Sequence, residues 1–539
     1  MRRIVTTVLA VALVGTAALA APATAADRTA GKDRPALPGV SDKVGGFDPK
    51  ALLDLSQPPL EPSLELAYEP SASQTLATAR RILAGNGRPS DPSATMALRD
   101  LFMQKTQLRG SERRLAERLL ARPTDGFGDP QGFGYTVAEA APACNTRLCV
   151  HYVPTGTDAP PSPEWVNYTL AVMDSVWTTE VDQMGYRPPL SDGSKGGNGL
   201  FDVYLKDLGG DLYGFCAGER KVKKRTASGY CVLDNDFAAA QFPSGTPDGN
   251  LRVTAGHEFF HAIQYAYDFA EDPWMMESTA TWMEERIATD VNDNRQYLPA
   301  SQIYAPQIPL DAFSQTSGFQ YGNWVFWEYL SNRYGVNIVN KAWKQAGSLK
   351  KDGGKYSLQA VDRALKGKGG FRKNYSKYVA GNLAPAVNFP EGAEIQAQFG
   401  GGRIFGSKVL SKGKRSKRFG TKIHHLSSAS YAFGPGKGLS GKKWKLSLKV
   451  SGPVRATSPS AVVVVYLLNG KRQVKTVKLN KRGDGMKKVT FDNRKVGAVS
   501  VSLINGSTRY RCGRDTVLAC QGKPLDDKLR FAVKAKVTK

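Results

Sequence analysis

LRVTAGHEFFHAIQYAYD, residues 251–268, contains two histidines four positions apart with a glutamate directly after the first. The stretch has no proline, and its apolar residues recur at helical spacing, which predicts a buried helix. Residues four apart lie on one face of a helix, so His257 and His261 can bind the same metal ion. Glu258 can then act on a water molecule beside that ion. This spacing predicts a catalytic zinc site with its own general base.

The pattern is unusual for a chain of this composition. There are five histidines among 539 residues, and at this frequency the motif is expected by chance on the order of 10⁻³ times. The alternative is a pair of hydrogen-bonded core histidines, which leaves the glutamate between them unexplained. In the zinc interpretation the metal polarises a substrate carbonyl, and Glu258 takes a proton from water and passes it to the leaving amine.

A third ligand is expected from the next predicted helix. The sequence WMMESTATWMEE, residues 274–285, follows a proline, and the short connection lets this helix fold back against the first. Glu277 then lies close enough to complete a His₂Glu zinc site. Glu284 lies two turns later on nearly the same face, either as a competing ligand or as a group behind the ligands. Glu285 and Arg286 are expected on a solvated face.

HEFFHAIQYAYD followed by WMMESTATWMEE resembles the gluzincin clan of zinc metallopeptidases, in which HExxH is combined with a downstream glutamate ligand. Residues 144–335 as a whole are similar to uncharacterised secreted bacterial proteins assigned as metalloproteases. The resemblance implies that His257, His261 and Glu277 bind zinc and that Glu258 is the general base. The residue before the ligand glutamate is a methionine where the family commonly has asparagine, so peptide-bond specificity is not carried over.

A hydrogen-bond donor must stabilise the oxyanion that forms when water attacks a peptide carbonyl. The segment FQYGNWVF, residues 319–326, resembles a later helix of the same family, which commonly uses a tyrosine or a histidine for this purpose. Tyr321 is therefore the candidate, with Tyr265 and Tyr267 as alternatives. Any of the 21 tyrosines can also be a packed residue whose hydroxyl is hydrogen-bonded elsewhere.

The first 25 residues have the organisation of a signal peptide. Two arginines precede a short apolar run, and Ala23-Thr24-Ala25 fits a cleavage site. No stretch is long enough for a transmembrane anchor. The six cysteines fall into three local pairs: Cys144 with Cys149, Cys216 with Cys231, and Cys512 with Cys520. Disulfides suit a secreted chain, and the mature protein is expected to be an extracellular monomer.

The sequence predicts a multidomain protein with three regions after the signal peptide. Residues 26–139 comprise a proline-rich lead and helical stretches, either a pro-segment or an accessory subdomain. Residues 140–395 have strands before the HExxH helix and mostly helices after it, which predicts an α+β zincin-like metallopeptidase domain. His151, in the first of these strands, is expected to pack rather than to bind metal. Residues 396–539 combine valine alternation with regular turns, which predicts a β-sandwich.

The net positive charge belongs to the C-terminal region. Residues 401–539 contain 33 Lys and Arg, five Asp and no Glu, a net charge of +28 against +26 for the whole chain. Such a surface attracts an anionic cell-envelope polymer, whereas the alternative is a surface that only keeps the protein soluble. The sequence shows no recognition helix or aromatic stacking platform, so sequence-specific nucleic-acid binding is not expected.

Two classes of function remain. The first is a secreted zinc peptidase that acts on a protein or peptide substrate. The second is a secreted polyanion- or surface-binding protein whose peptidase-like domain is inactive. The intact Glu258 favours the first class, because an inactive relative would often have lost its general base.

Overall fold

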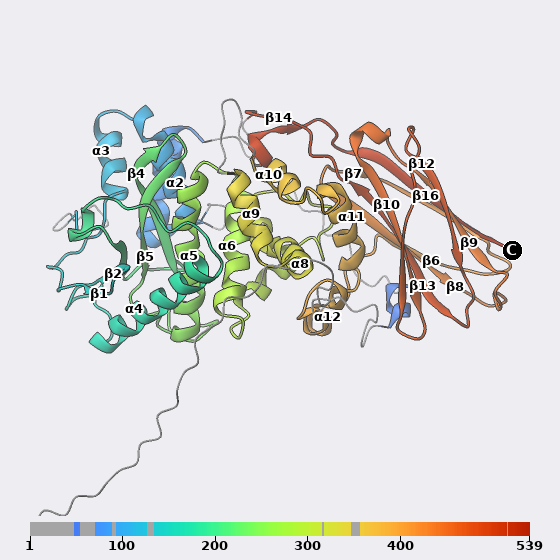
Figure 1. The fold of residues 1–539 in the computed structure, drawn as a ribbon, viewed down its shortest axis with the longest axis horizontal. Coiled ribbons are helices and arrows are strands. Elements are labelled where there is room, and N and C mark those ends of the chain that lie inside the picture. The colour runs from blue at the N-terminus through green and yellow to red at the C-terminus, as the bar shows by residue number, and fades with distance from the viewer. Residues whose placement is uncertain are drawn as a thin grey trace, which may run out of the picture. The chain divides into compact units, whose positions relative to one another are not determined.

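The computed structural model describes residues 48–53, 70–88, 93–126, 134–314, 317–346, 356–514 and 516–539 (Figure 1). The predicted signal peptide and most of the proline-rich lead lie outside these residues. The described part combines helices with several sheets and ends in a β-rich region, as the sequence predicts. None of the helices in these ranges is long and apolar enough to cross a membrane.

Three helices precede the first sheet: α1 (Ala72–Arg81), α2 (Ala94–Gln104) and α3 (Gly110–Leu119). The sequence predicts helical stretches at residues 73–85, 93–108 and 111–122, and each helix lies within its stretch or begins one residue before it. Ser93 caps α2, because its hydroxyl accepts a hydrogen bond from the third backbone amide of the helix. Unlike α3, whose surface is largely solvated, α2 is buried along most of its length. It packs against strand β4 (Gly214–Lys223).

The first sheet has five strands in the order β1-β2-β3-β5-β4. Besides β4, its strands are β1 (Ala143–Cys144), β2 (Leu148–His151), β3 (Phe201–Lys206) and β5 (Thr226–Asp234). The three central strands are parallel, and β4 runs antiparallel to β5 at one edge. Helix α4 (Pro163–Trp177) connects β2 to β3. The sequence predicts strands at residues 149–153, 201–205 and 230–234, which correspond to the three central strands, whereas the half-apolar, half-charged pattern of β4 indicates no strand.

Two helices after the sheet carry the HExxH motif and the downstream glutamate. Helix α5 (Pro247–Asp268) lies between β5 and α6 (Pro273–Ile287), so it is buried on nearly all sides. It begins four residues before the predicted start, because Thr246 accepts a hydrogen bond from the amide of Gly249 and a proline follows it.

A set of further helices follows: α7 (Phe319–Gly322), α8 (Trp324–Tyr334), α9 (Asn337–Ala346), α10 (Ser357–Ala364), α11 (Gly370–Asn382) and α12 (Gly392–Phe399). The connection between α6 and α7 contains a short 3₁₀ helix, Asp293–Ala300. Of these helices, α8 packs against α6 and α9 packs against α5. They therefore support the two helices of the predicted site from behind.

The C-terminal region contains two larger sheets. One has the order β11-β10-β13-β8-β6 and the other β12-β9-β16-β7. Their strands are β6 (Gly406–Leu410), β7 (Ser416–Ile423), β8 (Ser427–Pro435), β9 (Lys445–Ser451), β10 (Pro459–Leu467), β11 (Arg472–Thr476), β12 (Asp484–Thr490), β13 (Val496–Asn505) and β16 (Leu529–Thr538). Alternate residues of both sheets share one hydrophobic core. The predicted β-rich region is thus confirmed.

All three predicted disulfides are present: Cys144–Cys149, Cys216–Cys231 and Cys512–Cys520. The second joins β4 to β5 at directly opposite positions of the ladder. It therefore ties the edge strand to the body of the first sheet, close to α5.

A buried ion pair links the loop before α7 to the C-terminal region. Asp311 hydrogen-bonds His425 Nε2 at 3.1 Å, and it accepts hydrogen bonds from the Tyr510 hydroxyl and the Ala519 amide. Asp527 contacts the other ring nitrogen of His425 at 3.0 Å. Burial disfavours the charged ring, but the two carboxylates outweigh it and raise the pKa of His425 to about 9.

This pKa predicts a stability that falls at alkaline pH. The favourable contribution of protonated His425 is fully present below its ordinary pKa near 6.5 and is lost as the pH rises through about 9. We expect His425→Gln to lower the free energy of unfolding at pH 6.5 by up to about 3 kcal/mol and to lower it much less at pH 10. Denaturant titrations across this range measure the difference. The control is His424→Gln, at the neighbouring and more exposed position, and an equal effect of both variants would contradict the assignment.

Candidate metal centre

The antiparallel packing of α5 on α6 brings His257, His261 and Glu277 together. One ligand atom from each residue lies within 4.8 Å of the other two. The Nε2 atoms of His257 and His261 lie 3.2 and 3.6 Å from the same carboxylate oxygen of Glu277. The three side chains predicted as zinc ligands therefore converge on one point.

The other ring nitrogen of each histidine has a separate hydrogen-bond partner. His257 Nδ1 lies 2.6 Å from a carboxylate oxygen of Glu284, and His261 Nδ1 lies 2.8 Å from the amide oxygen of Gln264. Gln264 is itself held by a bond from its amide nitrogen to the carbonyl of Met276. These contacts fix both rings with Nε2 directed at Glu277, the orientation that partners behind the ligands usually impose on metal-binding histidines.

His261 Nε2 provides a direct test of whether the site fits a metal. The side chain is completely buried, and this nitrogen has no hydrogen-bond partner among the described residues. A buried nitrogen lone pair without a partner is costly. Zinc accepts imidazole nitrogens and carboxylate oxygens, so the chemistry of this donor set fits a zinc ion.

The electrostatics of the cluster favour a cation. Burial disfavours a charged ring at His257, but the hydrogen bonds that the ring donates to the carboxylates of Glu277 and Glu284 raise its pKa well above the ordinary value. Burial disfavours ionised Glu277, yet the two histidines hold its pKa well below the usual range. Burial also raises the pKa of Glu284 to about 7, although His257 opposes this shift. Without a metal, a proton on His257 balances buried negative charge, and a metal ion would supply the same balance.

Glu258 lies beside the three converging residues. It is 8% exposed, and one of its carboxylate oxygens accepts a hydrogen bond of 2.8 Å from the Thr95 hydroxyl. Its charge also acts on His257. The structure therefore places the predicted general base next to the predicted ligands but in contact with α2.

Of the three candidate tyrosines, Tyr321 has its ring against His257. Its ring centroid lies 6.3 Å from that of His257, and its hydroxyl interacts with Ser93. The hydroxyl of Tyr265 instead donates to the carbonyl of Cys216, and that of Tyr267 accepts from the amide of Arg187. The geometry favours Tyr321 over both alternatives, although its role as oxyanion donor stays a prediction.

Sequence analysis missed Gln264, Ser93 and Thr95. Gln264 follows His261 by three positions on the same helix, which is a weak signal that could have been used. Ser93 donates a hydrogen bond of 2.5 Å to Glu277, although the two are 184 positions apart. No pattern along the chain indicates such a contact.

A second group, Cys149, His151 and Asp202, has ligand atoms equally close together. Cys149 is bonded to Cys144 and cannot offer a thiolate. His151 Nε2 lies 2.9 Å from Asp202, whose other oxygen pairs with the buried Arg122. These interactions account for the group as a packed polar network, in agreement with the expectation for His151.

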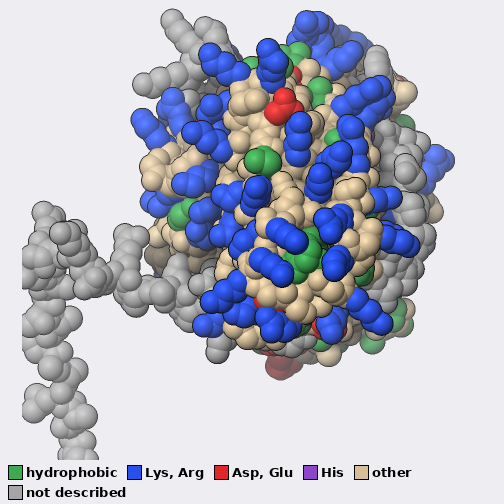
Figure 2. Space-filling view, turned by 90° about the vertical axis from the view of Figure 1, so that its right-hand side faces the viewer, with side chains coloured by type: hydrophobic (Ala, Val, Ile, Leu, Met, Phe, Trp, Pro, Cys, Tyr) green, Lys and Arg blue, Asp and Glu red, His purple; other side chains and the backbone are tan. Residues whose placement is uncertain are grey.

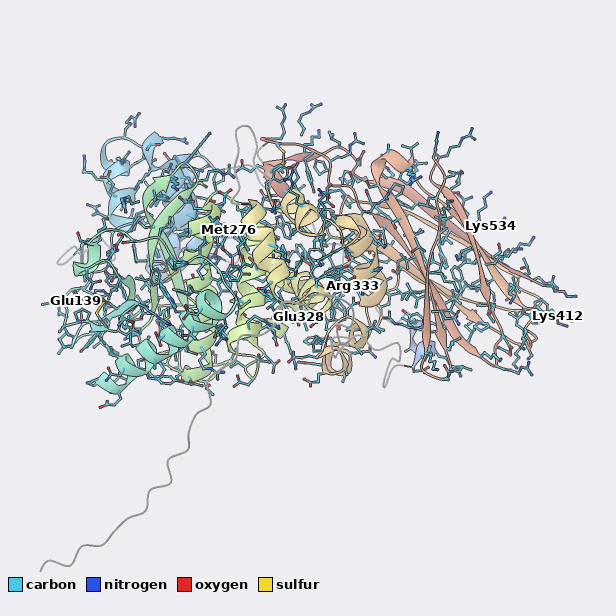
Figure 3. All side chains as sticks on the ribbon, in the orientation of Figure 1. Glu139, Met276, Glu328, Arg333, Lys412 and Lys534 are labelled. Carbon is cyan, nitrogen blue, oxygen red and sulfur yellow. A yellow bond between two sulfur atoms is a disulfide. The ribbon has the colours of Figure 1, made fainter. Side chains whose placement is uncertain are left out.

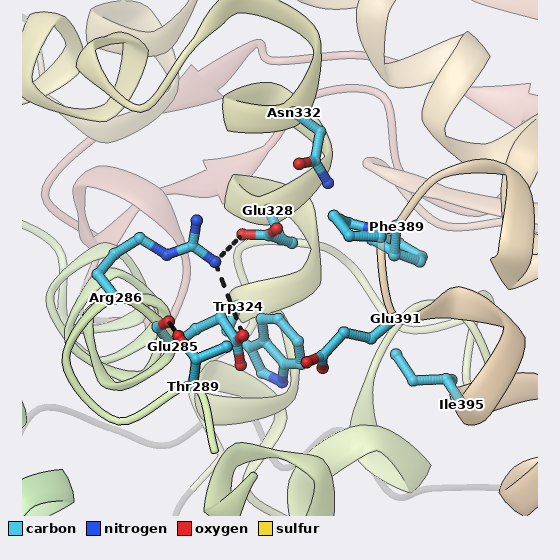
Figure 4. A pocket seen from close by; sticks show the side chains of 10 residues that line it. Glu285, Arg286, Thr289, Trp324, Glu328, Asn332, Phe389, Glu391 and Ile395 are labelled. Atoms are coloured by element: carbon cyan, nitrogen blue, oxygen red, sulfur yellow. Dashed lines mark hydrogen bonds and ion pairs between the residues drawn. The ribbon is translucent and has the colours of Figure 1, made fainter. Parts of the chain in front are cut away.

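The expectation for Glu285 and Arg286 is wrong. The two residues line a pocket of about 310 Å³ with Trp324, Glu328 and Glu391 (Figure 4). Glu285 is buried and accepts a hydrogen bond from Asn294, and Arg286 pairs with Glu328 at 2.9 Å. Packing of α8 against α6 covers the face that would otherwise be solvated. None of the residues that line this pocket is a predicted site residue.

A family described as a family of unknown function (DUF6055) matches residues 233–356, which include all five candidate site residues. No curated protein matches the chain at a significant level.

Several solved structures resemble parts of the chain at low similarity. The pre-peptidase C-terminal domain of a collagenase from Bacillus anthracis is 7% identical, with 24% of this chain and 94% of that chain covered and a TM-score of 0.15. A copper-binding protein of Methylomicrobium album BG8, CorA, is 11% identical, with 25% and 98% covered and a TM-score of 0.15. These scores are too low for any property to be transferred to this chain.

The geometry predicts different metal losses for the two glutamates of α6. Glu277→Ala removes a ligand and should abolish stoichiometric zinc binding. Glu284→Ala removes only the partner of His257 Nδ1, so affinity should fall by about 10–100-fold with zinc still bound at saturation. Competition with a chromophoric chelator measures both affinities. Zinc binding of equal strength in the two variants would mean that Glu277 is not a ligand.

Proposed function

We propose that this chain is a secreted zinc peptidase of the gluzincin type, built on a zincin-like domain. The observation that carries the proposal is the convergence of His257, His261 and Glu277 with one buried imidazole nitrogen that makes no hydrogen bond. When bound, zinc would polarise the substrate carbonyl and make a water molecule more acidic. The mixed sheet with its antiparallel edge strand β4 beside α5 supports this assignment.

The residues around the cluster would supply the general base, the oxyanion donor and the groups that orient the ligands. Glu258 would accept a proton from the attacking water and deliver it to the leaving amine. Tyr321 would donate its hydroxyl hydrogen to the oxyanion. Glu284 and Gln264 would act as positioning residues, because they orient the rings of His257 and His261.

The predicted signal peptide and the disulfides both support secretion. The predicted signal peptide implies export, and the three disulfides suit an oxidising compartment. The alternative is a secreted binding protein whose peptidase-like domain is inactive. The presence of Glu258 beside the ligands supports the active form, since a purely structural metal site needs no adjacent base.

Glu258→Gln separates the two alternatives. The carboxamide keeps the shape of the side chain but cannot accept a proton, so chelator-sensitive hydrolysis of a denatured protein should fall by about 10²–10⁴-fold. Zinc content should stay unchanged. The matched control is Glu285→Gln, which changes a buried glutamate on α6 outside the metal cluster. This variant should hydrolyse the substrate as fast as the wild type does when both are prepared in the same way. Near wild-type hydrolysis by Glu258→Gln would rule out the proposed mechanism.

A specific arrangement in the C-terminal region supports a second function, adsorption to an anionic polymer. Arg418 on β7, Lys534 on β16 and Lys449 on β9 are exposed and lie directly opposite one another in the ladder. Arg530 and Lys422 form a second such pair. Neighbouring strands lie about 4.8 Å apart, and like charges directly opposite each other destabilise a sheet.

These five cations form no ion pair with an acidic side chain in the described part of the chain. Figure 2 shows this end of the molecule, where Lys and Arg side chains are spread over the surface and few acidic side chains are visible. Lys534 and Lys412 extend from the same end in Figure 3. A polymer with regularly spaced negative charges would relieve the repulsion between the aligned cations.

The contribution of the row of Arg418, Lys534 and Lys449 to polymer binding can be compared with that of three other exposed lysines. The triple variant of Arg418, Lys449 and Lys534 to Gln should elute from a sulfated polysaccharide column at clearly lower salt than the wild type. The control is the triple variant to Gln at three exposed lysines away from this row: Lys471, Lys478 and Lys523. The control should elute closer to the wild type, and equal shifts would show that only total charge matters.

A further inference from the structure

The amino-terminal end of α2 lies directly on the predicted catalytic residues. The Ser93 hydroxyl donates to Glu277 at 2.5 Å, and the Thr95 hydroxyl donates to Glu258 at 2.8 Å. Ser93 also interacts with the hydroxyl of Tyr321. One short segment thus contacts a predicted ligand, the predicted base and the predicted oxyanion donor.

Thr95 also occupies the edge of the first sheet. Its hydroxyl oxygen accepts a hydrogen bond of 2.9 Å from the backbone amide of Cys216 on β4. This amide therefore points away from β5, along the edge at which an extended peptide could add as a further strand. The ring of Phe102, two turns further along α2, packs within 3.0–3.3 Å of the position that a Cβ atom at Gly218 would take. Helix α2 covers β4 from the site outwards.

The catalytic residues have almost no contact with solvent in this arrangement. The side chain of His257 is 14% exposed, and the side chains of His261 and Glu277 are fully buried. A polypeptide substrate must place a carbonyl beside these groups and Glu258. That position is closed while Ser93 and Thr95 remain in place.

We propose that α2 holds the chain in a latent form and that substrate gains access only when the segment containing Ser93 and Thr95 is displaced. This inference rests on the proposed function and adds its regulation. The two hydroxyls occupy the hydrogen-bonding positions that a substrate and its attacking water would use. Helix α2 therefore marks where the peptide binds, along β4 towards Glu258.

No disulfide can hold the segment, because no cysteine precedes Cys144. It is held by its connection to the chain, by packing and by hydrogen bonds, among them that of the buried Arg99 to the Glu271 carbonyl. The turn that contains Thr106 and Gln107, between α2 and α3, is exposed. Further along, Arg122 is buried in ion pairs with Asp202 and Glu219. A cut in the exposed turn would leave Arg122 and the chain after it in place. It would also separate α2 from that chain, so the contact of α2 with the predicted catalytic residues would no longer be intramolecular and dilution could release it.

The test uses the full chain with a specific protease site inserted between Thr106 and Gln107. The zinc-loaded protein is compared before and after cleavage and dilution. The first measurement is the binding of acetohydroxamate, a small zinc-directed ligand, by calorimetry. The second is chelator-sensitive hydrolysis of a quenched peptide, with cleaved Glu258→Gln as the blank. We expect cleavage to strengthen hydroxamate binding by about tenfold or more, since two hydrogen bonds to carboxylates must otherwise break.

The two measurements separate this inference from the proposed function. Stronger hydroxamate binding together with new hydrolysis supports both. Stronger binding without hydrolysis supports the closed site and argues against peptidase activity. Equally strong hydroxamate binding before and after cleavage overturns the latent form, whether or not the protein hydrolyses peptide.

A second variant avoids any loss of folding caused by cleavage. In the intact chain, Ser93→Ala combined with Thr95→Val removes both hydroxyls but keeps most of the side-chain volume. This variant should bind acetohydroxamate about tenfold or more tightly than the wild type. The control is Thr75→Val, which removes a buried hydroxyl that bonds Gln104 within the same helices. The latent form is wrong if the double variant binds no better than this control.

Discussion

The candidate metal centre depends on the fixed orientation of two imidazole rings, those of His257 and His261. Glu284 and Gln264 hold the Nδ1 atoms of His257 and His261, and both Nε2 atoms then face the buried Glu277. A buried carboxylate and two buried imidazoles need positive charge in the space between them. A proton can supply it in the free protein, and the proposed zinc ion would supply it by binding all three atoms at once.

The remainder of the fold keeps this cluster dry and in place. Helix α5 packs against β5 on one side and α6 on the other, with α9 behind. Helix α2 closes the side that faces β4. The hydrophobic cluster around these helices continues into residues of the C-terminal sheets, such as Ala432 and Ile504. The two regions predicted from the sequence, residues 140–395 and 396–539, therefore share buried contacts. Removing one region would expose apolar residues of the other, so substitutions are better tests of their roles than truncations.

Local patterns predicted much of the site, because its main residues lie on two neighbouring helices. The spacing of His257 and His261 fixes them on one face, and the short connection before α6 limits where Glu277 can lie. Near-neighbour spacing also predicted the disulfides. Roles that depend on distant segments could not be predicted. The contacts of Ser93 and Thr95 cross more than 160 positions, and the burial of Glu285 depends on how α8 packs.

The charge of the C-terminal region was likewise predicted from the sequence only in part. Composition alone places the positive charge there, but only strand register shows that Arg418, Lys534 and Lys449 stand in one row. An in-register row of like charges is unfavourable for the isolated sheet. The anionic polymer proposed as the ligand of this region would relieve that repulsion.

X-ray absorption at the zinc edge tests the central claim most directly. The purified chain should contain one zinc per molecule, with a first shell of nitrogen and oxygen at about 2.0–2.2 Å and the outer-shell signature of two imidazoles. A chain without zinc, a shell that contains sulfur, or a shell without imidazole would contradict the assignment of His257, His261 and Glu277 as ligands.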